Sequence, residues 1–422
     1  MFREPCLNAL WYYQEGINEL LYMVSAIEPI PESVLDCLSS CSGWNIVRSL
    51  QPEDASTLTF YSSRIKEIAF GGVPRMNLQQ RSSFATSFSE TVIFPRLRVL
   101  LWSSASGDYH LDFVLRTAGN KLTEIVGAVA YGKSPKLMAM VEKRLPDLTH
   151  FWLWDCEVTE DTDAATTRFF RNVLPSAKNL QELHLDTAVA EKYFSIWDTI
   201  QFLPHLRKLV LKWYNVKHVL PAVPLSLTTY GILTALTVVI REAPFLCHIL
   251  NKLSFPNLRE FRVRILWAED KPDEDIPHIR GILRSVVSAS AHSRLTSLVV
   301  EYGEDTIAES TVEELGTATE FLRLDDLRPL MAKYARLEVL DLRLRCSWAL
   351  TDDAIEEIVR VWGPHLKVFR LDPDGGWPPA SCVTFKGLQH IAQHCPTPHH
   401  SRSPLCWYST RRHPSCYGHH AG

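Results

Sequence analysis

The residue types that bind zinc gather near the C-terminus of this 422-residue sequence. Cysteine thiolates and histidine imidazoles hold structural zinc ions, usually at paired spacings such as Cys-x-x-Cys or His-x-x-x-His. The residues found here match no such knuckle, so the sequence predicts no metal site. They are Cys395, His399, His400, Cys406, His413, Cys416, His419 and His420.

A second group of residues that could do chemistry is acidic. Asp352-Asp353 and Glu356-Glu357 recur at helical spacing and could in principle hold a cation. Acidic residues in the first turn of a helix are also stabilised by the helix dipole. The second interpretation is favoured: a solvated helix N-terminus. Cys37 and Cys41, four residues apart, are interpreted as packing thiols rather than ligands.

Sequence motifs of common enzymes are missing from the chain. It contains no Gly-x-x-x-x-Gly-Lys or Gly-x-Gly-x-x-Gly phosphate loop, no Gly-x-Ser-x-Gly elbow and no His-Glu-x-x-His helix. We therefore predict no catalytic residues and no cofactor. An α/β enzyme with an unrecognised site stays as the alternative of another class, and it would show a deep pocket of converging polar groups.

Composition limits the partners and the compartment. The chain has 48 acidic and 44 basic residues, so no dominating field favours nucleic acid, and no stretch approaches the length of a membrane-spanning apolar helix. The ten cysteines are scattered, and the first residues do not form a secretory signal, which has a basic segment followed by an apolar run. This pattern indicates reduced thiols in the cytoplasm or nucleus. We expect no nucleic acid and no membrane partner.

One phrase recurs along the chain: an apolar residue, two others, an apolar residue, one other, and an apolar residue. Successive first leucines lie from 25 residues apart (Leu97 to Leu122) to 42 apart (Leu295 to Leu337), a spacing close to that of leucine-rich repeats. The copies are Leu97-Leu100-Trp102, Leu122-Ile125-Gly127, Leu148-Phe151-Leu153, Leu180-Leu183-Leu185, Leu206-Leu209-Leu211, Leu233-Leu236-Val238, Leu258-Phe261-Val263, Leu295-Leu298-Val300, Leu337-Leu340-Leu342 and Leu366-Phe369-Leu371.

The phrase predicts a short strand with one buried face, because its last positions alternate. Linking segments show helical spacing: Ala354, Ile355, Ile358, Val359 and Trp362 share one side of a helix capped by Thr351 or Asp352 and stopped by Gly363-Pro364. Strand and helix in repetition predict an α/β leucine-rich-repeat-like solenoid, with parallel strands on its concave face and helices on its convex face. The alternative is an ordinary doubly wound sheet.

The ends of the chain differ from this array. Residues 1–90 lack the phrase and are predicted to form a helical N-terminal cap and loop, with Leu20, Leu21, Val24 and Ile27 on one helix face. The solenoid is expected over 91–396 and a disordered tail over 397–422. Gly71 to Thr91, the acidic stretch Glu269 to Asp275 and the acidic stretch Glu301 to Asp305 are expected to be surface loops.

Residues flanking the second and third apolar positions of each phrase should point to the concave face, the usual binding surface of a solenoid. Tryptophans beside charged residues have the composition of an interface hot spot, although packing of Trp152 and Trp154 against flanking loops is the open alternative. The candidates are His150, Trp152, Trp154, Glu182, His184, Asp186, Lys208, Lys212, Glu260, Arg262, Arg264, Asp341, Arg343, Arg370 and Asp372.

Two segments carry a resemblance to a known family. The opening from Phe2 to Trp11, Phe-Arg-Glu-Pro-Cys-Leu-Asn-Ala-Leu-Trp, resembles the segment after the F-box in the F-box and leucine-rich-repeat-like family of mushroom-forming fungi. Leu350 to Pro396 resembles the closing repeats of that family, so the likeness covers residues 1 to about 396.

The resemblance implies the substrate-recognition part of a receptor for a cullin-type ubiquitin ligase, in which an F-box grips a Skp-family adaptor. No Leu-Pro-x-Glu segment typical of an F-box precedes Phe2. The sequence therefore predicts a non-catalytic protein-interaction solenoid and does not predict adaptor binding. The alternative is a complete substrate adaptor whose F-box is missing from this sequence.

Overall fold

The computed structural model describes most of the repeat array and parts of both ends. The described residues are 3–15, 20–21, 23–24, 27–30, 43–46, 51–70, 92–102, 114–128, 135–154, 168–186, 196–213, 228–241, 243–266, 276–290, 294–303, 321–344, 348–371 and 383–395.

A parallel sheet of twelve strands runs through the molecule. Its strand order follows the chain without reversal, whereas a doubly wound sheet reverses its order at a switch point, so the repeat interpretation holds over this sheet. All ten copies of the leucine phrase contribute a strand. The strands are β1 (Tyr13–Glu15), β4 (Glu67–Phe70), β5 (Val99–Trp102), β6 (Glu124–Ala128), β7 (His150–Trp154), β8 (Glu182–Asp186), β9 (Lys208–Trp213), β11 (Ala235–Ile240), β13 (Glu260–Leu266), β14 (Ser297–Gly303), β15 (Val339–Arg343) and β16 (Val368–Leu371).

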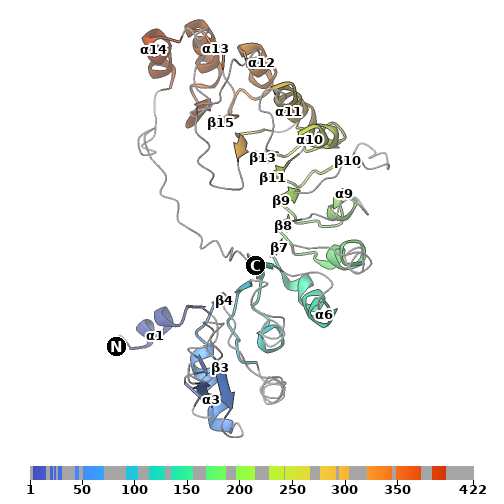
Figure 1. The fold of residues 1–422 in the computed structure, drawn as a ribbon, viewed down its shortest axis with the longest axis vertical. Helices are drawn as coiled ribbons and strands as arrows, with labels where there is room; N and C mark the ends of the chain where they lie inside the picture. Colours follow the sequence, from blue (N-terminus) through green and yellow to red (C-terminus); the bar gives the residue numbers. More distant parts are fainter. Residues whose placement is uncertain are drawn as a thin grey trace, which may run out of the picture.

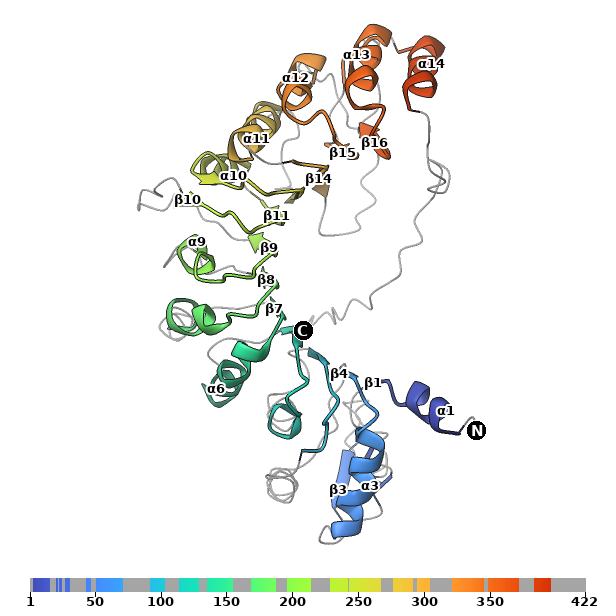
Figure 2. The ribbon, with the colours of Figure 1, turned by 180° about the vertical axis from the view of Figure 1, so that it is seen from behind.

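The helices cover the other side of the sheet. Figures 1 and 2 show an arc whose inner side carries the strands and whose outer side carries the helices between them. The arc is the shape expected when each repeat contacts only its neighbours. The helices are α1 (Arg3–Leu10), α3 (Pro52–Ser62), α6 (Pro135–Arg144), α9 (Ile196–Ile200), α10 (Ala243–Leu250), α11 (Ile276–Ala289), α12 (Leu324–Lys333), α13 (Asp352–Trp362) and α14 (Phe385–His394).

Smaller elements complete the described part. Two short pairs lie outside the large sheet: β2 (Ile27–Ile30) with β3 (Gly43–Ile46), which is antiparallel, and β10 (Thr228–Thr229) with β12 (Leu253–Ser254), which is parallel. A 3₁₀ turn, Leu145–Asp147, directly follows α6, and a π turn, Phe169–Val173, is followed by a 3₁₀ turn, Leu174–Ser176.

The parallel sheet begins earlier than the sequence predicted. β1 and β4 lie in the segment expected to be a helical cap, and Ile27 begins strand β2 instead of continuing a helix. Leu20, Leu21 and Val24 are buried as expected. The reason is a variant of the phrase, Ile65-x-x-Ile68-x-Phe70, in which isoleucine replaces the first leucine and Ile65 and Ile68 are fully buried.

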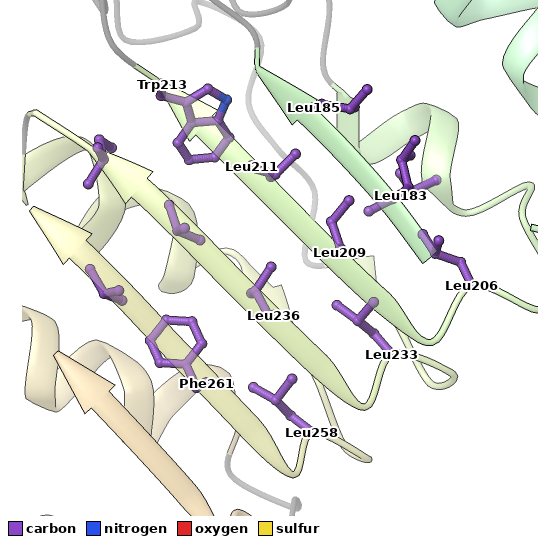
Figure 3. Close-up of a cluster of buried hydrophobic side chains, with 14 of the residues drawn as sticks. Leu183, Leu185, Leu206, Leu209, Leu211, Trp213, Leu233, Leu236, Leu258 and Phe261 are labelled. Atoms are coloured by element: carbon purple, nitrogen blue, oxygen red, sulfur yellow. The ribbon is translucent and has the colours of Figure 1, made fainter. Parts of the chain in front are cut away.

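The leucine phrase forms the core between sheet and helices. Its first and second apolar residues stack in rows from strand to strand, as Leu183, Leu209, Leu236 and Phe261 do in Figure 3. Each of these four side chains is at most 2% exposed. Burial of a leucine side chain stabilises the fold by roughly 1.5–3 kcal/mol, so repetition of the phrase supplies most of the driving force.

A tight turn sets the start of each strand. In several of the Pro-x-Leu segments the leucine N–H donates to the carbonyl three residues back, as from Leu148 to Leu145 (3.2 Å) and from Leu258 to Phe255 (3.2 Å), whereas Leu366 donates four residues back, to Trp362 (2.9 Å). Proline suits the second position of such a turn because its φ is already near –65°. The turn aims the next N–H groups at the preceding repeat, where Thr123 O accepts from both Thr149 (2.9 Å) and His150 (3.1 Å).

In the phrase copy Leu122-Ile125-Gly127 the third position is a glycine, whereas the other copies have a larger apolar residue there. Gly127 stands opposite Trp102 of β5, and a Cβ at this position would lie 2.5 Å from both the Cβ and the carbonyl oxygen of Trp102. A larger apolar residue in the third position of this phrase would therefore displace the neighbouring strand.

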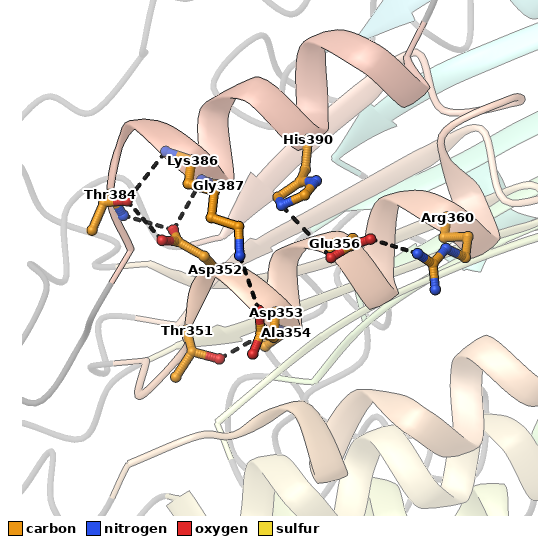
Figure 4. A network of polar contacts seen from close by, with 10 residues as sticks. All are labelled: Thr351, Asp352, Asp353, Ala354, Glu356, Arg360, Thr384, Lys386, Gly387 and His390. Atoms are coloured by element: carbon orange, nitrogen blue, oxygen red, sulfur yellow. Dashed lines mark hydrogen bonds and ion pairs between the residues drawn. The ribbon is translucent and has the colours of Figure 1, made fainter.

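The acidic residues of α13 form contacts within the protein. Thr351 caps α13 by accepting from Ala354 N (3.2 Å), and Asp352 accepts from Thr384 N, Thr384 Oγ1 and Gly387 N at the start of α14 (Figure 4). The Thr384 hydroxyl lowers the pKa of Asp352. Asp353, Glu356 and Glu357 pair with Lys386, Arg360 and Arg328 respectively. Asp352, Asp353 and Glu357 thus join α13 to its neighbours α14 and α12, whereas Glu356 and Arg360 pair within α13.

Helix α13 buries the predicted face, Ala354, Ile355, Ile358, Val359 and Trp362. The last helix is different: Phe385 and Leu388 of α14 are 89% and 56% exposed. Among the described residues, no helix has the length and apolar character needed to cross a membrane.

Several predictions concern segments outside the described residues. These are the tail 397–422 with its cysteines and histidines, the stretch 71–91, the stretch 269–275, and Cys37 and Cys41. The prediction of a loop over Glu301 to Asp305 is wrong in part. Glu301, Tyr302 and Gly303 continue strand β14, because they pair with Arg264, Ile265 and Leu266 of β13.

Candidate protein-binding face

The strands place alternate side chains on the concave surface. Leu183 and Leu185 of β8 point into the core, so Glu182 and His184 point to the opposite side, because successive side chains of a strand alternate. The parallel register aligns these positions in rows across β7, β8 and β9. One row is His150, Glu182 and Lys208, and the next is Trp152, His184 and Val210. The concave face is thus a set of aligned rows.

A stacked aromatic pair lies on the N-terminal half of this face. The rings of Trp152 and His184 lie 3.9 Å apart between centroids at an interplanar angle of 10°. Trp152 is half-buried, and its stacking partner comes from the neighbouring strand. The stack therefore holds a partly accessible indole in one orientation on the concave face.

Glu182 organises the polar groups around the stack. Its Oε1 accepts from His184 Nε2 (2.5 Å) and Lys208 Nζ (2.8 Å), and its Oε2 lies 3.9 Å from His150 Nε2. Burial raises the pKa of Glu182, but the hydrogen bonds from Lys208 and His184 outweigh burial and leave that pKa lowered. We call Trp152, His184, Glu182, His150 and Lys208 the Trp152 cluster.

His184 is held neutral at physiological pH. Burial lowers the pKa of its imidazole to about 4, against the opposing effect of Glu182. The neutral ring with its proton on Nε2 matches the hydrogen bond to the ionised Glu182 carboxylate. On the outer side of the cluster, His150 Nδ1 lies 2.9 Å from Thr149 Oγ1 and 3.5 Å from Glu124 Oε1.

The middle of the concave face carries small side chains that are mostly apolar. Val210 and Val239 are each 7% exposed, and Thr237 stands between them on β11. On the C-terminal side, Arg262 of β13 lies next to Thr237 in the register, and Val299 of β14 lies beyond Arg262. The strip separates the polar groups of the two halves.

Arginines dominate the C-terminal half. Arg343 Nε and Nη2 bind the two oxygens of Asp341 at 3.1 and 2.8 Å, and Arg370 Nη1 binds Asp341 Oδ2 at 3.2 Å. Glu301 lies between Arg264 (3.7 Å) and Arg343 (3.8 Å). We call Arg262, Arg264, Arg343 and Arg370, with Glu301 and Asp341, the arginine cluster; it extends across β13 to β16.

The carboxylates of the arginine cluster are sheltered while the guanidinium groups face solvent. The side chain of Asp341 is 6% exposed, whereas the side chains of Arg264 and Arg370 are 50% and 52% exposed. Arg262 and Glu260 are exposed on β13. The surface offered to a partner is therefore mainly guanidinium.

Ten of the fifteen predicted candidates belong to these two clusters, and Glu260 lies exposed on β13 outside the arginine cluster as defined. Lys212 lies on β9 at the concave register, two residues beyond Val210. Trp154 and Asp186 lie at the ends of β7 and β8, and their side chains are outside the described part, as is Asp372. Glu124 and Glu301 were missed, although both occupy concave register positions beside His150 and Arg264.

Among the described residues, no group of three or more histidine, cysteine or acidic side chains could hold a metal ion. The carboxylates of both clusters bind partners on their own strand and on the neighbouring strand, as Glu182 binds His184 and Lys208, and Asp341 binds Arg343 and Arg370. Such networks orient side chains for binding.

Comparisons with known proteins add little to this geometry. No family model matches the sequence, and no curated protein matches it. A solved structure described as the Rad7 and Elc1 complex in yeast is similar over 78% of this chain and 83% of its own, at 14% identity and a TM-score of 0.30. A likeness at that TM-score carries no argument about function.

Proposed function

We propose that this chain is a non-catalytic protein-binding solenoid whose concave face holds another protein. The observation that carries the proposal is the Trp152 cluster: a half-buried tryptophan, fixed by stacking at 3.9 Å and surrounded by paired charges, on the concave side of a continuous sheet. Tryptophan and arginine are enriched among residues that dominate binding energy, and both are prominent on this face.

The finer proposal is a role as the substrate-recognition part of a cullin-type ubiquitin ligase receptor. Its support is the resemblance of Phe2 to Trp11 and of Leu350 to Pro396 to the fungal F-box and leucine-rich-repeat-like family. In that role the concave face would hold the protein to be ubiquitinated, in the cytoplasm or nucleus. The test is to mix the chain with a purified Skp-family adaptor and to capture the chain. Capture of the adaptor together with the chain would favour the complete-adaptor alternative over an isolated recognition surface.

Affinity capture with matched variants tests the binding role. Tagged chains are incubated with lysate of a mushroom-forming fungus, and captured proteins are quantified by mass spectrometry. Lys208→Glu reverses a charge on the concave face, whereas Phe202→Ala truncates a side chain that is 53% exposed in the turn before β9. We expect proteins that are lost with Lys208→Glu and retained with Phe202→Ala. Equal capture by both variants would argue against the concave face.

A further inference from the structure

The arginine cluster has a layered arrangement of charge. Four arginines, Arg262, Arg264, Arg343 and Arg370, share the concave side of β13 to β16 with three carboxylates, Glu260, Glu301 and Asp341. Asp341 and Glu301 have side chains only 6% and 16% exposed, so two of the three carboxylates lie beneath the guanidinium groups. A partner approaching this surface meets a positive outer layer.

The sheltered carboxylates hold the arginines in place. Asp341 binds Arg343 through both of its oxygens and also binds Arg370, which is the fork geometry that fixes a guanidinium plane. A guanidinium group has five N–H donors, and Arg370 donates to Asp341 through its Nη1. The exposed half of the Arg370 side chain can therefore donate to a second anion at little further cost in side-chain entropy.

From this arrangement, we propose that the concave face over β13 to β16 binds an extended acidic segment of a partner protein. The inference rests on the proposed protein-binding role and names the chemistry of the partner. Arg262 on β13 and Arg370 on β16 share one register row, and strands lie ~4.8 Å apart, so these two positions are separated by roughly 14 Å across the sheet. An extended segment rises ~3.3 Å per residue, so acidic side chains four residues apart reach both arginines.

Fluorescence anisotropy with a defined probe tests this proposal. The probe is a fluorescein-labelled Gly-Ser-Glu-Ser-Gly-Ser-Glu-Ser-Gly peptide, which carries two glutamates four residues apart. Its comparison peptides carry glutamine, or phosphoserine, in place of both glutamates. We expect the glutamate peptide to bind at least tenfold more tightly than the glutamine peptide, with an affinity that falls as salt rises. The phosphoserine arm shows whether carboxylate or phosphate is the preferred anion.

Two matched variants separate a built site from general attraction. Arg370→Glu should weaken the glutamate peptide at least tenfold, whereas Arg284→Glu, an exposed position on the outer helix α11, should leave it within about twofold. Asp341→Asn gives the sharpest contrast: it makes the face more positive, yet we expect weaker binding because Arg343 and Arg370 lose their anchor.

Several results would overturn the acidic-segment proposal. They are equal binding of the glutamate and glutamine peptides, no binding of either, equal weakening by Arg370→Glu and Arg284→Glu, or tighter binding to single-stranded DNA than to the peptides. If one of them is found while Lys208→Glu still abolishes capture of a protein, the binding role stands and only the acidic assignment fails.

Discussion

The two halves of the concave face have the same scaffold and different chemistry. Under both halves the core rows are built from the same leucine phrase, with Leu183 and Leu340 each fully buried. On the surface, one carboxylate, Glu182, receives a lysine and a neutral histidine beside a stacked tryptophan. In the other half two sheltered carboxylates, Asp341 and Glu301, form ion pairs with arginines. The repeat therefore conserves one side of each strand while the opposite side is free to specialise.

Core truncation should affect both halves alike. Leu183→Ala and Leu340→Ala each remove a fully buried side chain from the same position of the phrase, and each should destabilise its own half by roughly 2–5 kcal/mol. Hydrogen exchange followed by mass spectrometry measures this locally, since a repeat array need not unfold as one unit. A marked difference between the two variants would mean that the halves do not share one scaffold.

Acidic pH should destabilise the half of the sheet that contains His184 more than the half that contains the arginine cluster. The pKa of His184 is about 4 in the fold, below its ordinary value of 6.5. The contribution of the neutral imidazole to the free energy of unfolding is therefore complete above pH 6.5 and is lost as the pH falls towards 4. The loss amounts to on the order of 3 kcal/mol. We expect amides of β7 to β9 to exchange faster at pH 4.5, while those of β13 to β16 change less.

The control for the acid prediction is His184→Gln. This variant keeps a side-chain donor towards Glu182 but removes the titrating imidazole, so the difference between the halves should shrink. An unchanged pH response would show that another group is responsible.

Removal of the anchoring carboxylates should show which half depends more on its ion pairs. Asp341→Asn replaces two charged acceptor oxygens by a single amide oxygen at a site 4% exposed, so Arg343 and Arg370 can no longer both be held, and we expect a loss of roughly 1–3 kcal/mol. Glu182→Gln should cost less, because an amide oxygen can still accept from Lys208, which is 44% exposed. Urea unfolding monitored by exchange in each half measures both. A larger effect of Glu182→Gln would reverse this ranking.

Loss of the stacked tryptophan should have the smallest effect on stability and a large effect on binding. Trp152→Ala removes a half-buried ring whose stacking on His184 contributes roughly 0.5–1.5 kcal/mol. We expect a small change in the unfolding midpoint together with lost capture of the partner. Unchanged capture would favour packing as the only role of Trp152.

The sequence predicted the strands and the faces better than the contacts. The alternation in phrases such as Leu180-Leu183-Leu185 is enough to assign a strand and its buried side, and helix α13 begins and ends where its cap and Gly363 indicate. β4 was missed because Ile65 replaces the first leucine of its phrase. β1, Tyr13-Gln14-Glu15, has no apolar alternation and is a strand because β4 lies beside it.

The partners of the surface groups could not be predicted. Register aligns Glu182 with Lys208, but the additional bond from His184 Nε2 depends on side-chain rotamers that no periodicity specifies. In the same way, Glu301 was assigned to a loop, whereas it lies between Arg264 and Arg343. Residue type and face are local properties, while the pairing between strands is a property of the assembled sheet.

Site-specific photo-crosslinking tests the binding role of the concave face most directly. A photoreactive phenylalanine analogue replaces Thr237, at the apolar strip between the two halves, or replaces Lys333, exposed at the end of the outer helix α12. We predict that the Thr237 probe forms a discrete crosslink to a protein captured from lysate, and that Lys208→Glu abolishes it. Crosslinks to the same protein from Lys333 but none from Thr237 would contradict a concave binding face.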